Sequence, residues 1–200
     1  MLPFILLGAT SEENDATVAG RPFDRSRDGF VMGEGGAFFV LETLESARTA
    51  GRKILAVLQG WGSSCDAHNV TAPHPEGKGA VLSMKAALAD AGIGTEHIDY
   101  INAHGTGTPL NDIIEANAIK QVFGDSPPPV SSSKGQIGHT IAAAGALELA
   151  ACIAALQAGR LPPNARLQEQ DPAIGVNLVP PEGSNYAPNM ILSNSFGFGG

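Results

Sequence analysis

Two short runs of mainly apolar residues in the first third of the chain predict β-strands. They cover residues 37–41 and 54–62, and a stretch of helix-forming residues, 42–48, lies between them. An apolar run of this length with polar neighbours is typical of a strand that is buried in a sheet. The chain is therefore expected to alternate strands with helices from this point on.

Apolar residues then recur at helical spacing from residue 77 to residue 91. Val81, Met84 and Leu88 are three and four residues apart, which places their side chains on one face of an α-helix. Gly92 follows, and glycine commonly ends a helix. The pattern predicts a helix over residues 77–91 with one buried face.

Three later short strands are predicted, and each delivers polar residues at its carboxyl end. They cover residues 98–103, 130–133 and 190–193. The first is followed by His104, the second by Lys134 and the third by a glycine-rich segment, residues 194–200. Ligand sites in α/β sheets gather beyond the carboxyl ends of strands, so these three loops are expected to converge on one pocket.

Two helices are predicted between these strands. The first is capped by Asn111 or Asp112 and runs to about Val122. The second lies within residues 137–158, where Glu148 is the one fully charged residue. That segment is long enough to span a membrane, but its alanines and glycines are only weakly hydrophobic and favour insertion into lipid little. We interpret it as a helix that is apolar on every side and buried at the centre of a layered domain.

Composition narrows the class of protein. The 200 residues are 43% hydrophobic and 16% charged, with a formal net charge of −8. This fits a globular chain and disfavours nucleic acid or an anionic membrane surface as partner, since both select clustered Lys and Arg. Cys65 and Cys152 are too few for a disulfide framework, and residues 1–7 lack the basic start of a secretion signal. A reducing, cytoplasmic setting is expected.

Five motifs in a fixed order carry a family resemblance. They are Arg21-Pro22-Phe23-Asp24, Asp28-Gly29-Phe30-Val31-Met32-Gly33-Glu34-Gly35, Asn102-Ala103-His104-Gly105-Thr106-Gly107-Thr108-Pro109, Ser132-Ser133-Lys134 through Gly138-His139, and Asn194 through Gly200. In this order they closely resemble the β-ketoacyl-acyl-carrier-protein synthases, which are elongating ketosynthases of fatty-acid and polyketide assembly. The resemblance covers almost the whole chain and is weaker before Arg21.

The resemblance implies the thiolase-like α/β fold, two similar halves stacked in αβαβα layers. Residues 1–36 would be the tail of the N-terminal half. Residues 37–200 would be the C-terminal half, ending before the closing strand that the family has after its Gly-Phe-Gly-Gly motif. The nucleophilic cysteine of the family belongs to the N-terminal half, so this chain alone is expected to be inactive.

The family reaction is a decarboxylative Claisen condensation of a cysteine-bound acyl group with a malonyl thioester. The resemblance makes His104 and His139 the neutral hydrogen-bond donors to the developing oxyanion. Lys134 would be the third catalytic residue, and Glu148 would pair with it, because a charged residue is seldom buried without a partner. The start of a helix at His139 and the nearby Lys134 are both expected to lower the pKa of His139.

Further roles follow from the same resemblance. Thr106 and Thr108 would bind the pantetheine arm of the carrier protein, and Phe198 would gate the acyl pocket with its N–H in the oxyanion hole. Phe196 is expected in the core. The family uses no cofactor and no metal; its partner is acyl carrier protein, and its members form homodimers or heterodimers with a related subunit. No nucleic acid and no membrane are expected as partners.

Each assignment has an alternative. A histidine near a turn is usually a structural hydrogen bonder, Lys134 and Glu148 could form a purely structural pair, and the threonines could stabilise their turn. Cys65 lies in a family pocket-lining loop and is not expected to be the nucleophile; with His68 and His74 it matches no zinc spacing. For the whole chain, the alternatives are a thiolase, whose motifs differ, and a non-catalytic partner of the chain-length-factor kind.

Overall fold

A small parallel sheet forms the centre of the computed structural model, which describes residues 2–198. Its strands are β1 (Tyr100–Asn102), β2 (Val130–Ser131) and β3 (Ile191–Ser193), in the order β2-β1-β3. The register places Ile101 opposite both Val130 and Leu192. These three side chains are buried, so each strand contributes an apolar side chain to the core.

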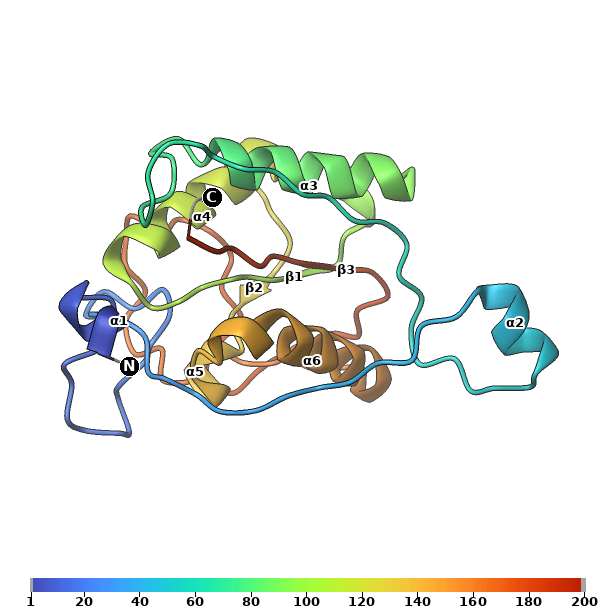
Figure 1. The fold of residues 1–200 in the computed structure, drawn as a ribbon, viewed down its shortest axis with the longest axis horizontal. Helices are drawn as coiled ribbons and strands as arrows, with labels where there is room; N and C mark the ends of the chain where they lie inside the picture. Colours follow the sequence, from blue (N-terminus) through green and yellow to red (C-terminus); the bar gives the residue numbers. More distant parts are fainter. Residues whose placement is uncertain (1, 199–200) are drawn as a thin grey trace.

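Helices cover both faces of this sheet (Figure 1). Helices α3 (Lys78–Ala91) and α4 (Pro109–Phe123) pack against each other on one face, and α6 (Ala144–Ala158) packs on the other. Short pieces complete the element order: α1 (Leu2–Leu6), α2 (Leu44–Thr49), η1 (Thr95–His97), α5 (Lys134–Ile137) and η2 (Ile141–Ala143). The main hydrophobic core lies between α3, α4 and the sheet.

The central helices and strands confirm most of the predicted elements. Helix α3 buries Met84 and Leu88 and ends at Gly92, whose φ of 67° is left-handed. Helix α4 begins earlier than predicted, because Pro109 occupies its first turn and Thr108 precedes it as the N-cap residue. The predicted caps therefore lie inside the helix, and Asp112 is fully buried there.

The predicted strands at residues 37–41 and 54–62 are not paired in the structure. Both runs are extended, and neither joins a sheet within residues 2–198. They form an arm, residues 34–63, that carries α2 to the end of the molecule opposite α1 (Figure 1). Phe38, Val40 and Trp61 are exposed on this arm. The prediction of β-strands at these two runs is therefore wrong for the described residues, although both runs are extended.

Helix α6 differs from its prediction in burial. It buries Ala144, Glu148, Cys152 and Ala155, and Leu149 lies on a side that remains open. The prediction of a helix buried on every side is therefore wrong for the described residues. Within residues 2–198, one segment, residues 141–158, is long and apolar enough to cross a membrane; a core helix of a soluble protein meets the same criterion, and α6 packs on β3.

Candidate functional site

A buried glutamate fixes the backbone of the loop that follows β1. Glu115, on α4, accepts hydrogen bonds from the backbone N–H groups of His104 and Gly105, both at 2.8 Å. Gly105 has a positive φ, and a Cβ there would lie 2.6 Å from the Cβ of Ser132. Glycine is therefore required at this position, and His104 occupies a fixed place at the carboxyl end of the strand.

Lys134 fixes the ring of His104. The Lys134 Nζ lies 3.3 Å from His104 Nδ1 and donates to the His104 carbonyl at 2.6 Å. An ammonium group can only donate, so Nδ1 of His104 is the acceptor and the ring proton resides on Nε2. Burial, and then the charge of Lys134, lower the pKa of His104 well below its usual value. The imidazole is therefore a neutral donor through Nε2.

His139 reaches the same protonation state by a different route. Its Nδ1 accepts a hydrogen bond from the backbone N–H of Ile141 at 3.1 Å, which leaves the proton on Nε2. The His139 backbone is fixed by Val31, whose carbonyl accepts from the His139 N–H at 2.7 Å, and by Gly33, whose N–H donates to the His139 carbonyl at 3.0 Å. The rings of His104 and His139 lie 5.4 Å apart.

The pKa of His139 falls to about 4, as predicted in direction but with a different main cause. Burial contributes most and Lys134 second. The predicted helix start at His139 is wrong, because η2 begins at Ile141 and α6 only at Ala144. Both histidines are therefore neutral at physiological pH, and each presents one N–H donor.

Lys134 and Glu148 form the expected ion pair. Both side chains are almost fully buried, and the Lys134 ammonium donates to Glu148 Oε1. The second Glu148 oxygen accepts from the Ser195 hydroxyl at 3.0 Å. Lys134 therefore lies behind His104, where its hydrogen bonds set the tautomer and orientation of that ring.

An open groove of about 1920 Å³, with mostly apolar lining, passes over these groups. His104, His139, Thr106, Thr108 and Phe198 all line it. The three predicted loops thus converge on one site, as expected from their positions after the strands. Lys134 and Glu148 are not among the described residues that line the groove, which fits their supporting position.

The two threonines and the two phenylalanines differ in how firmly they are held. The hydroxyls of Thr106 and Thr108 are hydrogen-bonded to each other at 2.8 Å. Phe198 is more than half exposed and contacts Phe4, with ring centroids 6.1 Å apart. Phe196 was expected in the core but is only partly buried, and its ring lies 5.3 Å from that of His104.

Sequence reasoning missed three residues that support the site. The sequence pattern indicates Asp112 as a candidate helix cap and Glu115 as a residue of the first helical turn. Both are fully buried, and burial raises the pKa of Glu115 to about 7. Phe30 packs edge-on against His139 at 4.9 Å. The sequence does contain a signal for the two acids. They are three residues apart on a helix, and apolar residues lie beside them. Carboxylates in such a setting are buried and need hydrogen-bond donors.

Neither cysteine has the setting of a nucleophile in this groove. Burial raises the pKa of Cys152 to about 12, which keeps its thiol protonated. Cys65 is exposed and is not among the described residues that line the groove. Within residues 2–198 no group of three potential metal ligands is found.

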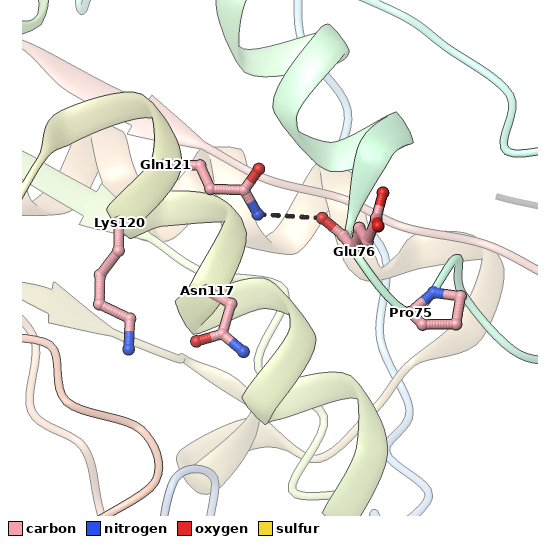
Figure 2. A pocket seen from close by; sticks show the side chains of 5 residues that line it. All are labelled: Pro75, Glu76, Asn117, Lys120 and Gln121. Atoms are coloured by element: carbon pink, nitrogen blue, oxygen red, sulfur yellow. Dashed lines mark hydrogen bonds between the residues drawn. The ribbon is translucent and has the colours of Figure 1, made fainter.

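A second depression lies away from the histidines, between α4 and the loop that enters α3 (Figure 2). Its lining residues are Pro75, Glu76, Asn117, Lys120 and Gln121. Gln121 Nε2 donates to the Glu76 carbonyl at 3.0 Å across it. None of these five residues lines the groove that contains the histidines.

Comparison with known proteins identifies the family. A model of the β-ketoacyl synthase C-terminal domain matches residues 55–168, more than half of the chain. The chain belongs to the β-ketoacyl synthase family. Its relatives include the 3-oxoacyl-(acyl-carrier-protein) synthase 2 of Synechocystis sp., which is 44% identical over 96% of this chain. The chain spans about half the length of the curated relatives it matches, 47% in that case.

Solved structures agree with this assignment. A structure of a type II polyketide ketosynthase with its acyl-carrier protein matches 99% of this ketosynthase chain and 50% of the chain compared, with a TM-score of 0.95 and 36% identity. The ishigamide ketosynthase/chain length factor matches with a TM-score of 0.92 and 39% identity over 100% of this chain and 48% of the other. The fold is thus the predicted thiolase-like ketosynthase fold.

Proposed function

We propose that this chain supplies the histidine half of a ketosynthase active site. The reaction is the decarboxylative Claisen condensation of an acyl thioester with malonyl-acyl-carrier protein. One observation carries the proposal: two neutral imidazoles of fixed tautomer, 5.4 Å apart, line one groove. Neutral donors at this spacing suit an oxygen that becomes negative during the reaction, and one such donor can contribute about 3 kcal/mol.

Each site residue has a role in this proposal. His104 and His139 donate to the thioester oxygen as decarboxylation makes an enolate, and Lys134 holds His104 in the donor tautomer while Glu148 offsets its charge. Thr106 and Thr108 bind the pantetheine arm, and Phe198 opens and closes the acyl end of the groove. The fractional exposure of Phe198, 57%, is consistent with a side chain that can move.

The nucleophilic cysteine is proposed to reside in the remaining half of the protein. The raised pKa of Cys152 and the position of Cys65 outside the groove lining support this division. Residues 1–36 would then be the tail of the N-terminal half and residues 37–200 the C-terminal half. A cytoplasmic homodimer, or a heterodimer with a related subunit, would receive its substrates on acyl carrier protein.

A non-catalytic partner of the chain-length-factor kind is the second candidate. It is favoured by the similarity to the ishigamide ketosynthase/chain length factor. The hydrogen bonds that fix both imidazole tautomers favour the enzyme, because a partner that only shapes a pocket has no need of two neutral donors in the groove.

A mixing assay tests the proposal. This chain, with and without a separately expressed N-terminal half, receives acyl- and malonyl-carrier protein, and ketoacyl product and carbon dioxide are measured together. Condensation is expected only on mixing and is lost in His104→Ala. The surface histidine His97, exposed on η1, provides the matched control His97→Ala. A folded, associated mixture that forms no product would favour the non-catalytic partner.

A further inference from the structure

One N-terminal segment, residues 21–33, contacts both histidine loops. Its Gly29 N–H donates to the Gly107 carbonyl at 2.9 Å, beside the threonine pair. Its Val31 and Gly33 form the two backbone hydrogen bonds to His139. This segment lies outside the residues 55–168 that the family model matches. We call it the strap.

Arg27 fastens the strap to the loop that carries the threonines. Its Nε donates to the Thr108 carbonyl at 3.2 Å, and its Nη2 donates to the Pro109 carbonyl at 3.0 Å. Its Nη1 donates to the Asp24 carbonyl at 2.8 Å and to Asp171 Oδ2 at 2.7 Å. The guanidinium is almost fully buried, and its five-donor fork suits several acceptors around one plane.

Asp112 holds the other side of the same turn. Its Oδ1 accepts from the Gly107 N–H at 3.2 Å, and its Oδ2 accepts from the Phe23 N–H at 2.9 Å. Arg27 Nε lies 3.7 Å from Asp112 Oδ2, which supplies a countercharge to this fully buried carboxylate. The turn from Gly107 to Pro109 is therefore fixed through its N–H on one side and its carbonyl groups on the other.

We propose that Arg27 is a positioning residue that fixes the Thr106–Thr108 hydroxyl pair against the groove so that it can bind the pantetheine arm of the substrate. This inference rests on the proposed function, since it assigns that arm to the threonines. Arg27 does not line the groove and acts through the Thr108 and Pro109 carbonyls. A buried ion pair is by itself weak evidence that a residue stabilises the fold. The guanidinium of Arg27, however, binds two adjacent carbonyl groups and so holds the loop in one geometry.

The test measures binding by the folded chain, independently of turnover. The full 200-residue chain is titrated with acetyl-pantetheine, and the amide signals of Thr106, Gly107 and Thr108 are followed by NMR. Arg27→Lys keeps the charge but loses the fork, so its affinity for acetyl-pantetheine is expected to fall about tenfold. We call the contacts of Arg27 with Thr108, Pro109 and Asp171 the clamp. Asp171→Asn, which weakens one of these contacts, is expected to give a smaller loss of affinity.

Arg25 is the matched control. It lies on the same strap, but its ion pair with Glu169 is exposed, so Arg25→Lys is expected to bind acetyl-pantetheine like the wild type. Urea unfolding of each variant separates stability from affinity. A variant that is less stable but binds with wild-type affinity once folded would reduce Arg27 to a structural role and overturn the inference.

The outcomes also separate this inference from the proposed function. Binding at residues 106–108 that weakens in Arg27→Lys, with no product in the mixing assay, supports the clamp and rejects the condensation. Condensation on mixing with no acetyl-pantetheine effect at residues 106–108 supports the function and rejects the clamp. If Arg27→Lys does not fold, the Asp171→Asn affinity decides the matter in the same way.

Discussion

Individual residues of the site owe their chemical state to burial. His104 and His139 have lowered pKa values mainly because their imidazoles are removed from water, and Lys134 adds to the effect. Glu115 is shifted in the opposite sense, because burial disfavours a carboxylate and no cation pairs with it among the contacts described above. The same physical cause therefore favours the neutral form of two bases and of one acid.

Glu115 is expected to make stability depend on pH. Its folded-state pKa is about 7 against 4.5 unfolded, so the unfolded state loses its proton first as pH rises. The stabilising contribution of Glu115 is complete below pH 4.5 and is lost as the pH rises toward 7. The free energy of unfolding is expected to fall by about 3 kcal/mol over this range.

The comparison with Glu115→Gln isolates this effect. His139 has the opposite shift, from 6.5 to about 4, so its stabilising contribution is lost as pH falls from 6.5 to 4, in both proteins alike. The difference in unfolding free energy between wild type and Glu115→Gln, measured in urea from pH 4.5 to 7.5, is expected to decrease by about 3 kcal/mol. A difference that does not vary with pH would contradict the assignment.

At the scale of elements, the strap and the loop at His139 form one unit. A Cβ added at Gly33 would clash with the Ile137 carbonyl oxygen, and a Cβ added at Gly138 would lie only 2.9 Å from the Gly33 backbone. These close approaches allow the two backbone hydrogen bonds between the strap and His139.

Gly33→Ala is expected to separate the strap from His139. Overpacking of this kind costs about 2 kcal/mol or more in unfolding free energy, measured by urea denaturation, and the His139 amide signal is expected to shift. Gly36→Ala is the control, since a Cβ there meets no atom within 4 Å. Equal stability of the two variants would rule out a tight contact at Gly33.

Elements were predictable from sequence where the apolar spacing of a segment matches its packing in the structure. Helix α3, the three strands and the loops after them follow from apolar spacing and glycine positions. The start of α4 was misplaced, because the Thr108 hydroxyl is bonded to Thr106 and does not mark the cap. The Arg27 clamp could not be read from sequence, since Arg27 and Pro109 are brought together only by the fold.

At the scale of the whole molecule, the arm of residues 34–63 leaves apolar side chains exposed. The runs at residues 37–41 and 54–62 have the sequence of buried strands, but the structure leaves them in an exposed arm. Periodicity predicts which residues prefer burial but does not specify which segment provides it. Large exposed apolar surfaces of this kind usually mark an interface.

Trp61 reports on this surface, because it is the single tryptophan of the chain and is exposed. The chain alone is expected to show the red-shifted fluorescence of a water-exposed indole. When the chain associates with a separately expressed N-terminal half, the Trp61 emission is expected to shift to the blue. The same shift is expected when the chain associates with a longer protein that contains this sequence. Trp61→Phe provides the blank, and emission that is already blue in a chain shown to be monomeric would contradict the exposed arm.

The fixed tautomers of the two histidines bear on the fate of the carbanion in the proposed reaction. An enolate is a strong base, and an imidazolium beside it would deliver a proton to carbon and waste the decarboxylation. A neutral imidazole N–H is a far weaker acid, so it can donate a hydrogen bond to the oxygen without giving up its proton. By holding Nδ1 as an acceptor in both rings, Lys134 and the Ile141 amide keep the second proton away. In the proposed reaction, this arrangement would reserve the enolate for carbon–carbon bond formation.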